Sequence, residues 1–427
     1  MLNVLHIPPA SFRRFIQIIS LVLLLHTNSF NQEIIWEQTN GPINGNVWAI
    51  GIDEDDVIYA ADDAKLFRSK DDGDTWELVK DWTSEADEIV EIVFNDSGHI
   101  FVGTFGGAGV YRSTDEGQTW LYPAFSLPGV NDIKIGHNGD VIAGTMLNVW
   151  ISNDNGYNWV VRNQGLPAQT TVVCVFVDQI ENYFIGTYGG GIERIYKSTN
   201  FGESWFASGD GLHPSVAIIS IVENSTNFIF AGSEAGQEVA RSIDNGETWN
   251  YFGSGLPLGD FTLITNSLDF VFAGLTFGAG VYRSIDDGET WAEYNNGLVN
   301  KTILSFGINS EGVLFAGSWG DGIYRTIRST TYIETEIVDS NSNYFLRNYP
   351  NPFNSSTKVE FGLSKSGKVI IDLYSINGEK INKLVDEYLT AGSYSFGMND
   401  SKIASGIYII VFKSNNNILT KKVLLLK

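Results

Sequence analysis

The chain has 427 residues, of which 45 are glycine and 11 are tryptophan, and only 18% are charged. This length exceeds what one small core needs, and this composition favours many short strands and turns over long helices or disorder. The formal net charge of −23 at pH 7 argues against binding to nucleic-acid phosphates or to anionic membrane surfaces.

Residues 1–30 have the pattern of a secretory signal peptide. Arg13 and Arg14 precede the apolar run FIQIISLVLLLH (15–26), and the polar TNS (27–29) follows it. A basic start, a short apolar core and a polar exit are typical of an export signal. The run is shorter than the roughly 20 residues of a comfortable membrane span. We therefore expect export with cleavage between residues 27 and 32, the alternative being an uncleaved anchor. No later segment is apolar enough to cross a bilayer.

An eight-residue motif recurs six times along the chain. Its copies are SKDDGDTW (69–76), STDEGQTW (113–120), SNDNGYNW (152–159), STNFGESW (198–205), SIDNGETW (242–249) and SIDDGETW (284–291). The first residues of successive copies lie 39 to 46 residues apart. A period in the 40s with glycine and tryptophan landmarks predicts a β-propeller with about four strands in each blade.

Each period has the same internal order. In the sixth, FTLITN (261–266) and FVFAGLT (270–276) read as strands, the turn FGAG (277–280) precedes VYRS (281–284), and WAEY (291–294) follows the motif. The second period repeats this order and ends in WLYP (120–123). The alternation of apolar and polar residues indicates strands that stack between neighbouring blades.

The two ends of the repeat region complement each other. IYRT (323–326) is a third strand with no motif after it, and IIWEQTNGP (34–42) is a fourth strand with no motif before it. We predict that Trp36 and its neighbours complete a seventh blade and close the ring, because closure removes the open sheet edges. The alternative is that YIETEI (332–337) supplies this strand. The predicted fold is thus all-β, with a seven-bladed propeller over residues 31–327.

The motif S-x-D-x-G-x-T-W resembles the Asp-box of the BNR repeat families. These include sialidases, sortilin-type receptor domains, xyloglucanases and plant photosystem assembly factors. The resemblance covers residues 34–327. It specifies the blade and not the chemistry, because the same box serves enzymes and receptors.

The box residues themselves are predicted to be structural. An Asp at the start of a tight turn accepts hydrogen bonds from backbone N–H groups further along. A calcium loop would need several alternating oxygen ligands, whereas this motif keeps one carboxylate and loses it in the fourth copy. We therefore predict no metal and no cofactor at the box positions, which are Asp71, Asp115, Asp154, Asn200, Asp244 and Asp286.

Strand order places any ligand site on the face away from the boxes. The boxes share a face with the turns between first and second strands, and the turns between second and third strands lie on the other. The resemblance implies the same, since boxes lie opposite the active site in Asp-box propellers. Aromatic side chains that could stack on sugars or apolar groups occupy matching positions there, namely Phe105, Tyr188, Phe277 and Trp319. The other blades carry Met146, Glu234 and Asp62 nearby. The alternative is that each aromatic ring packs over its own glycine-rich turn.

Catalytic residues are harder to find. A sialidase needs an arginine triad, but the candidate arginines occupy equivalent positions before successive boxes and cannot converge; they are Arg68, Arg112, Arg241, Arg283 and Arg325. The F/Y-R-I-P motif of sialidases is absent. Asp132 and Asp260 lie near the starts of first strands, but nothing in the sequence pairs them for hydrolysis. The histidines show no metal-ligand spacing. Cys174 in TVVCVFV (171–177) fits a buried strand better than a nucleophile. We assign no catalytic residue.

The C-terminal part differs in charge. Residues 340–427 carry a net charge of +5 and residues 31–339 a net charge of −30, and such a step marks a domain boundary. We predict a linker at 328–345, which contains the polar VDSNSN (338–343), and a β-sandwich at 346–427. Its expected strands are KVEFGL, KVIIDLYS, SYSFGM, GIYIIVFK and LTKKVLLLK.

This part also resembles the C-terminal sorting domain of the type IX (Por) secretion system. The matching features are YPNPFN (349–354), VIIDLY (369–374), NGEK (377–380), ASGIY (404–408) and the terminal KKVLLLK. The resemblance implies a Bacteroidetes-type bacterium and passage through the type IX machinery. In that family the domain is removed near its start, and the cargo is released or attached to surface lipopolysaccharide. The alternative is a carbohydrate-binding or fibronectin-like sandwich.

Two classes of function follow. The first is a secreted or cell-surface propeller without catalytic activity that binds a glycan or a protein, for example as a sortilin-type scaffold. The second is a secreted glycoside hydrolase. Two convergent carboxylates in a groove would favour the second class.

Overall fold

The computed structural model describes residues 35–330 and 344–425. Short gaps within these ranges fall at 43–44, 84–87, 107–108, 123–126, 189–193, 214–215, 235, 237, 350–356, 376–379, 399–402, 405 and 416. The predicted signal peptide therefore lies outside the described residues.

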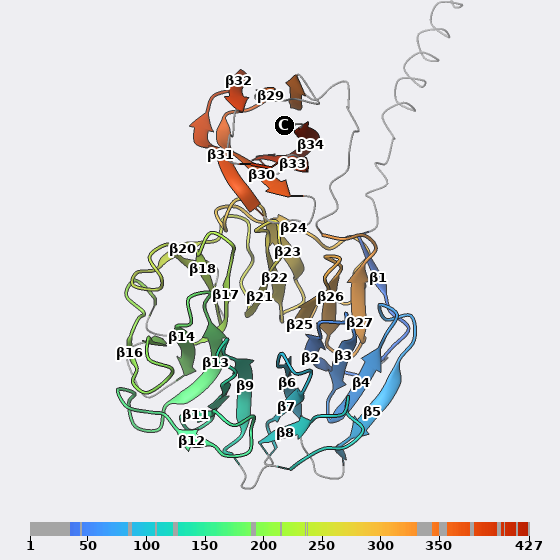
Figure 1. The fold of residues 1–427 in the computed structure, drawn as a ribbon, viewed down its shortest axis with the longest axis vertical. Coiled ribbons are helices and arrows are strands. Elements are labelled where there is room, and N and C mark those ends of the chain that lie inside the picture. Colours follow the sequence, from blue (N-terminus) through green and yellow to red (C-terminus); the bar gives the residue numbers. More distant parts are fainter. Residues whose placement is uncertain are drawn as a thin grey trace, which may run out of the picture. The chain divides into compact units, whose positions relative to one another are not determined.

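Within residues 35–330 the described strands form seven antiparallel sheets, six of four strands and one of three (Figure 1). The first strands are β2 (Val47–Ile52), β6 (Ile89–Phe94), β9 (Val130–Ile135), β13 (Thr171–Val177), β17 (Ile218–Glu223), β21 (Phe261–Thr265) and β25 (Ile303–Ile308). The second strands are β3 (Ile58–Asp62), β7 (Ile100–Thr104), β10 (Val141–Thr145), β14 (Tyr183–Tyr188), β18 (Ile229–Ser233), β22 (Val271–Leu275) and β26 (Leu314–Ser318).

The third and fourth strands complete the sheets. The third strands are β4 (Lys65–Ser69), β8 (Val110–Ser113), β11 (Val149–Ser152), β15 (Ile195–Ser198), β19 (Val239–Ser242), β23 (Gly280–Ser284) and β27 (Ile323–Thr326). The fourth strands are β5 (Glu77–Asp81), β12 (Val160–Val161), β16 (Phe206–Ala207), β20 (Asn250–Phe252), β24 (Ala292–Glu293) and β1 (Trp36–Gln38). Five second strands are buried along their whole length, as expected of strands flanked by two layers.

The sheets form a closed ring. Each first strand contacts the first strand of the next sheet, and β25 contacts β2. A cluster of buried apolar side chains lies between each pair of neighbouring sheets, including the pair formed by the last sheet and the first. The ring is therefore held by burial between sheets, the dominant stabilising term in folding.

The N-terminal strand completes the last sheet, as the sequence predicted. β1 pairs with β27 in antiparallel register, with Trp36 opposite Thr326. Trp36 is 1% exposed, and its indole nitrogen donates a hydrogen bond to the carbonyl oxygen of Tyr294 in the preceding sheet at 2.6 Å. The competing segment 332–337 lies outside the described residues.

The sheet of β6, β7 and β8 corrects one expectation. WLYP (120–123) was expected to form its fourth strand. The structure gives this segment only an isolated bridge between Leu121 and Arg112, and Leu121 is largely exposed. Tyr122 has no strand pairing, and residues 123–126 lie outside the described part of the chain.

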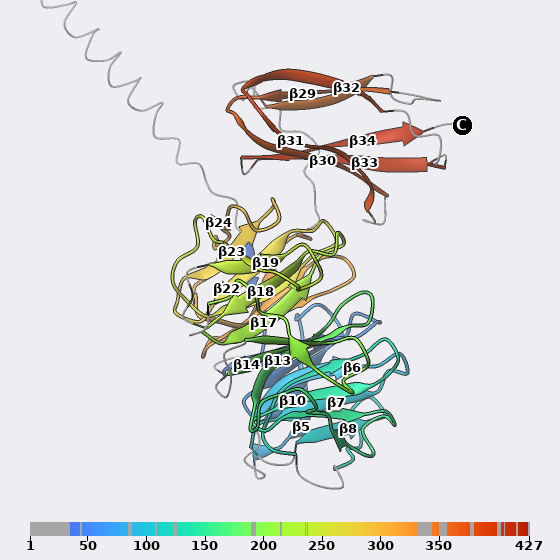
Figure 2. The ribbon, with the colours of Figure 1, turned by 90° about the vertical axis from the view of Figure 1, so that its left-hand side faces the viewer.

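The C-terminal tail, residues 344–425, contains two antiparallel sheets that share a core (Figure 2). One consists of β28 (Phe345–Tyr349), β29 (Thr357–Leu363) and β32 (Gly392–Met398), and the other of β31 (Lys380–Leu389), β30 (Gly367–Ser375), β33 (Gly406–Ser414) and β34 (Asn417–Leu425). β28 and β31 were not expected from the sequence. Described residues of the range predicted as a linker contact both parts: the Thr330 hydroxyl donates to the carbonyl oxygen of Gly312 in the ring, and Phe345 pairs within the tail.

Candidate binding face and central channel

Each Asp-box is a closed hydrogen-bonded turn. In the first box the Ser69 hydroxyl donates to Asp71 at 2.8 Å and accepts from the amide of Gly73 at 2.8 Å. The amide and hydroxyl of Thr75 both donate to the carboxylate of Asp71, at 2.8 and 2.6 Å. These bonds lower the pKa of Asp71. The box carboxylate is thus committed to its own turn, and the other boxes repeat the arrangement.

The fourth box shows why its Asn is tolerated. The Asn200 side-chain oxygen accepts from the amide of Ser204 at 3.0 Å, and its NH₂ group donates to the Ser204 hydroxyl at 3.0 Å. Phe201, the next residue, has a left-handed φ of 57°, a conformation that bulky residues rarely adopt. The turn therefore imposes a left-handed backbone conformation on the residue after the box Asp or Asn, even where that residue is bulky.

We expect Asp115→Asn to leave thermal stability close to that of the wild type, and Asp115→Ala to lower the unfolding midpoint. The asparagine can repeat the bonding of Asn200, whereas alanine leaves the Thr119 amide and hydroxyl without their acceptor. Hydrogen bonds from Thr119 lower the pKa of Asp115, so the stabilisation by its carboxylate is complete above pH 3.8 and is lost as the pH falls. Melting curves of both variants at pH 7 provide the measurement, and equal midpoints would contradict the role given to the carboxylate.

Among the described residues, no group of three or more His, Cys, Asp or Glu side chains is placed to hold a metal ion. The box carboxylates each face the hydroxyl and amide groups of their own turn. Their geometry is that of a turn and not of an ion cage.

The basic residues that precede the boxes bind the next sheet. Four of them donate to a backbone carbonyl in the following box, as Arg68 to Glu116 at 3.1 Å, Lys197 to Asn245 at 2.8 Å, Arg241 to Asp287 at 2.5 Å and Arg325 to Asp72 at 2.7 Å. Arg112 instead lies over the ring of Tyr157 in the next box, 4.4 Å from its centre. Arg283 stacks on Tyr294 and Phe270. Arg283 thus packs within its own sheet, whereas the other side chains tie neighbouring sheets together. None of these contacts brings the basic residues together on one ligand.

Contacts identify the end of the ring that holds the boxes. The turns between first and second strands bond boxes of the next sheet: Asn95 bonds Asn155 at 3.0 Å, Asn224 bonds Asp287 at 3.1 Å, and Asn309 bonds Asp72 at 3.0 Å. The boxes and the first turns therefore lie at one end, as predicted from strand order. We call this the box end and the other the rim end.

The predicted aromatic residues are exposed at the rim end. Phe105, Tyr188, Phe277 and Trp319 are 44%, 58%, 65% and 51% exposed. Trp319 makes an edge-to-face contact with Trp48 on the first strand β2, with ring centres 5.5 Å apart. Their own turns thus leave about half of each ring uncovered.

Met146, which the sequence places near this face, and three aliphatic residues that the sequence did not indicate extend this surface. Met146 and Leu147 in the turn after β10, and Leu258 and Val299 in the links between sheets, are all largely exposed. We call these four residues and the four aromatic residues the rim surface. Its signal in the sequence was a shared place in the repeat, where apolar residues stand in turns that are otherwise polar or glycine-rich.

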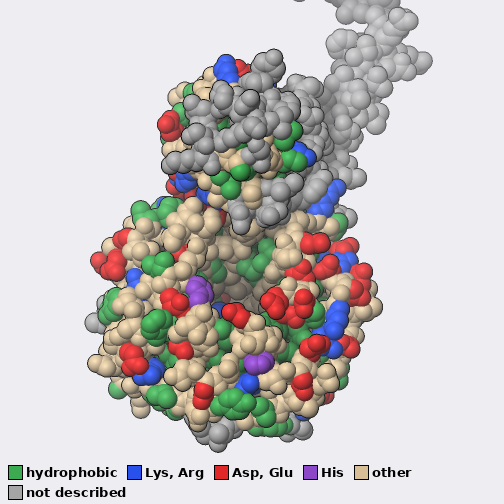
Figure 3. Space-filling view, viewed as in Figure 1, with side chains coloured by type: hydrophobic (Ala, Val, Ile, Leu, Met, Phe, Trp, Pro, Cys, Tyr) green, Lys and Arg blue, Asp and Glu red, His purple; other side chains and the backbone are tan. Residues whose placement is uncertain are grey.

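A central channel lies inside the ring. Residues of all seven first strands line a cavity of about 280 Å³, among them Trp48, Asn131 and Thr262. Within it, the Lys134 ammonium lies 2.6 Å from a Glu91 carboxylate oxygen and 3.0 Å from one of Asp132. Burial raises the pKa of Glu91 to about 7 even though Lys134 opposes this shift. In Figure 3, Asp and Glu side chains outnumber Lys and Arg on the visible surface of the ring.

Two sequence candidates prove to be structural. Asp132 accepts the amide of Val175 in the next sheet at 2.7 Å, and Asp260 accepts the hydroxyl of Thr276 at 3.0 Å. The Lys134 ammonium also binds Asp132, at 3.0 Å. Cys174 is buried, its thiol donates to the carbonyl of Ile218 at 3.3 Å, and burial raises its pKa. This thiol is a core residue and not an activated nucleophile.

Comparison with solved structures defines the class of fold. YCF48 from Cyanidioschyzon merolae matches with a TM-score of 0.54 and 16% identity, over 69% of this chain and 98% of that one. PorZ, a surface component of the type IX secretion system of Porphyromonas gingivalis, matches with 0.52 and 14%, over 92% and 60%. Virginiamycin B lyase from Staphylococcus aureus matches with 0.58 and 12%, over 69% and 98%. The ring is therefore a β-propeller.

The tail is identified more specifically. Residues 347–426 match the family model of the secretion system C-terminal sorting domain. The chain thus carries a sorting domain of the Por type, which indicates export by the type IX system. No curated protein matches the sequence significantly. In the described residues, no helix has the length and apolar character that a membrane crossing requires.

Proposed function

We propose that the mature protein is a secreted or surface-attached binding module without catalytic activity. Its seven sheets are the blades of a seven-bladed propeller of the Asp-box type. Its C-terminal β-sandwich is the sorting signal that the type IX machinery recognises. The match of residues 347–426 supports the export route. The observation that carries the binding role is the rim surface, because each of its eight apolar side chains is at least 44% exposed, and exposed apolar surface of this kind marks interaction sites.

A protein or peptide is the ligand that this surface favours. Sugar rings are recognised by flat aromatic faces, whereas the rim surface mixes aromatic residues with Met146, Leu147, Leu258 and Val299. Aromatic and methionine side chains are enriched in the cores of protein interfaces. A propeller of similar fold, YCF48, has been solved bound to D1 peptide. A glycan ligand, which aromatic stacking alone would also suit, is the alternative.

We expect Tyr188→Ala combined with Trp319→Ala to weaken binding of the mature chain to its peptide ligand by about tenfold or more, as loss of central aromatic anchors does. Peptide and glycan arrays probed with the mature chain identify the ligand, with hydrolysis products monitored. Phe201→Ala is the matched control, because Phe201 is 49% exposed but lies at the box end. Equal binding by the double variant and the wild type would exclude the rim surface, and binding confined to the glycan array would reassign the ligand.

The second candidate is a glycoside hydrolase, and the channel is where its chemistry would have to be. The raised pKa of Glu91 is what a general acid needs. However, Lys134 binds both carboxylates of the channel, and Asp132 also binds a backbone amide. The ammonium thus already binds both carboxylates that a substrate would have to engage, so we place the function at the rim surface.

A further inference from the structure

The sixth sheet differs from the others at its box end, where its apolar residues are covered. Leu268, in the turn between β21 and β22, is 3% exposed, whereas Ile180, at the same place between β13 and β14, is 59% exposed. The box after β23 shows the same contrast. Ile285 is 6% exposed, and Ile243, its equivalent after β19, is 64% exposed. The compared positions are thus covered in the sixth sheet and exposed in the fourth and fifth sheets.

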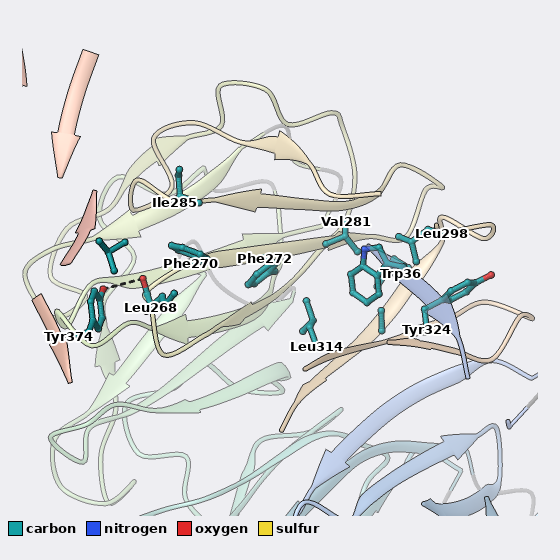
Figure 4. Packing of buried hydrophobic residues seen from close by; sticks show 13 residues of the cluster. Trp36, Leu268, Phe270, Phe272, Val281, Ile285, Leu298, Leu314, Tyr324 and Tyr374 are labelled. Carbon is teal, nitrogen blue, oxygen red and sulfur yellow. Dashed lines mark hydrogen bonds between the residues drawn. The ribbon is translucent and has the colours of Figure 1, made fainter. Parts of the chain in front are cut away.

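Side chains of the C-terminal tail provide this cover. The Tyr374 hydroxyl donates to the carbonyl oxygen of Leu268 at 3.4 Å, and the Lys413 ammonium donates to the same oxygen at 2.8 Å. The Lys413 nitrogen also lies 4.7 Å from the centre of the Phe270 ring. Val411 and Tyr374 belong to the same buried cluster as Leu268 and Phe270. Figure 4 shows Tyr374 beside Leu268, joined by the hydrogen bond.

Opposite charges surround this apolar contact. The Lys380 ammonium lies 3.2 Å from a carboxylate oxygen of Asp269 in the ring and 3.4 Å from one of Asp372 in the tail. The Lys368 ammonium lies 3.0 Å from Glu289 in the box. The pairing follows the overall charges, since residues 31–339 carry −30 and residues 340–427 carry +5. Complementary charge of this kind fixes which surfaces meet and in which register.

The charged groups also make the contact specific. Asp269 and Asp372 are almost completely buried, and burial raises the pKa of Asp372. Removal of one partner from a buried pair leaves a charge without compensation, which is strongly unfavourable. Tyrosine and lysine at the centre of the contact can return to water when the surfaces separate, because each keeps a polar end. Such a surface suits an interface that forms and dissociates.

We propose that the box end of the sixth sheet is a docking site for the sorting tail of the same chain, and that it keeps the tail bound after the peptide between them is cut. The site consists of Leu268, Asp269, Phe270, Ile285 and Glu289 in the ring. The matching face of the tail consists of Lys368, Tyr374, Lys380, Val411 and Lys413. Proteolytic removal of the tail is thereby separated from its physical release. This inference is independent of the ligand at the rim surface.

The test uses the mature chain with a specific protease site placed between residues 335 and 340. After complete cutting, the two fragments should elute together from a gel-filtration column at micromolar concentration. Ile285→Ser should raise the dissociation constant of the cut fragments about tenfold or more, because the substitution replaces a buried apolar side chain with a buried hydroxyl group. Ile243→Ser is the matched control and should change nothing. Separate elution of the wild-type fragments, or equal behaviour of the two serine variants, would overturn the proposal.

A second pair of variants tests the same contact at partly exposed residues, where substitutions are less disruptive to folding than in the core. Lys368→Glu and Glu289→Lys should each weaken the association of the cut fragments, and the two changes together should restore it, since the exchanged charges again attract. An exposed pair contributes a few tenths of a kcal/mol to about 1 kcal/mol, so the expected single-variant change is up to about fivefold. Additive weakening in the double variant would count against docking through these residues.

Discussion

Replacement of Trp36 by alanine should lower the free energy of unfolding by about 3–5 kcal/mol, the usual cost of removing a buried tryptophan. Trp36 packs with Leu298, Leu314 and Tyr324 between the last two sheets (Figure 4). Its loss leaves a cavity there and removes the donor to the Tyr294 carbonyl. Because this strand pairs with β27, the variant also weakens the contact that closes the ring. Chemical denaturation of the mature chain at pH 7 measures the change.

Gln38→Ala is the control for this prediction, since Gln38 lies on the same strand but points to the surface. Its side chain donates only to an exposed loop at Asp321, and surface changes of this kind usually stay within about 0.5 kcal/mol. Deletion of residues 31–40 should go further than either substitution and expose the edge of β27 to aggregation. A Trp36→Ala variant that unfolds at the wild-type denaturant concentration would show that β1 does not close the ring.

The repeat made the ring predictable from sequence. The box at 69–76 and its later copies fix a period, and a period implies equivalent sheets with equivalent neighbours. Trp36 could be assigned to the last sheet because an unpaired fourth strand and a sheet lacking one are complementary. One local prediction failed: WLYP (120–123) has the residues of a strand, yet among its described residues, 120–122, only Leu121 makes a bridge. Pairing at an outer edge depends on tertiary context more than on propensity.

The tail was less predictable. Its unforeseen strand β31, which contains KINKLVDEYL (380–389), is mostly exposed and rich in charge. It lacks the strict alternation that marks a half-buried strand. It forms because β30 offers a long partner edge, with which it pairs over almost its whole length. A local sequence pattern does not show that another part of the chain supplies the strand edge with which a segment pairs.

The candidate sites were also only partly predictable from the sequence. The aromatic residues of the rim could be located because turn positions follow from strand order. In the channel, Asp132 was a sequence candidate but Glu91 and Lys134 were missed. A signal for them existed, because they are 43 residues apart, about one period, and so occupy adjacent first strands. The contrast between Ile285 and Ile243 has no signal, because SIDDGETW and SIDNGETW are nearly identical and the difference comes from a distant segment.

Lys134→Met should destabilise the ring in a pH-dependent way, by about 1–3 kcal/mol at pH 8 and by less at pH 5. One-third of the Lys134 side chain is exposed, so the loss is smaller than for a fully buried pair. Burial disfavours its charged form, but Asp132 and Glu91 together raise the pKa of Lys134. The wild-type ammonium therefore persists at both pH values. Without it, the ionised carboxylates of Glu91 and Asp132 face each other without a cation.

The direction of this pH dependence of stability follows from the raised pKa of Glu91. Because this pKa is about 7 in the folded wild type, the folded chain retains a proton between pH 4.5 and 7 that the unfolded chain has lost. The contribution of Glu91 to stability therefore falls as the pH rises through that window. Loss of Lys134 raises the pKa further and extends the fall above pH 7, which makes the variant weakest in alkaline solution.

Urea denaturation of the wild type and the variant at both pH values measures this difference. Lys134→Arg should retain most of the stability, since it preserves the positive charge. Lys134→Met combined with Glu91→Gln should lose the pH dependence, because a single carboxylate remains and still accepts the Val175 amide. An equal loss at pH 5 and pH 8 would mean that Lys134 acts through the packing of its methylene groups. The channel charges would then be incidental to the stability of the ring.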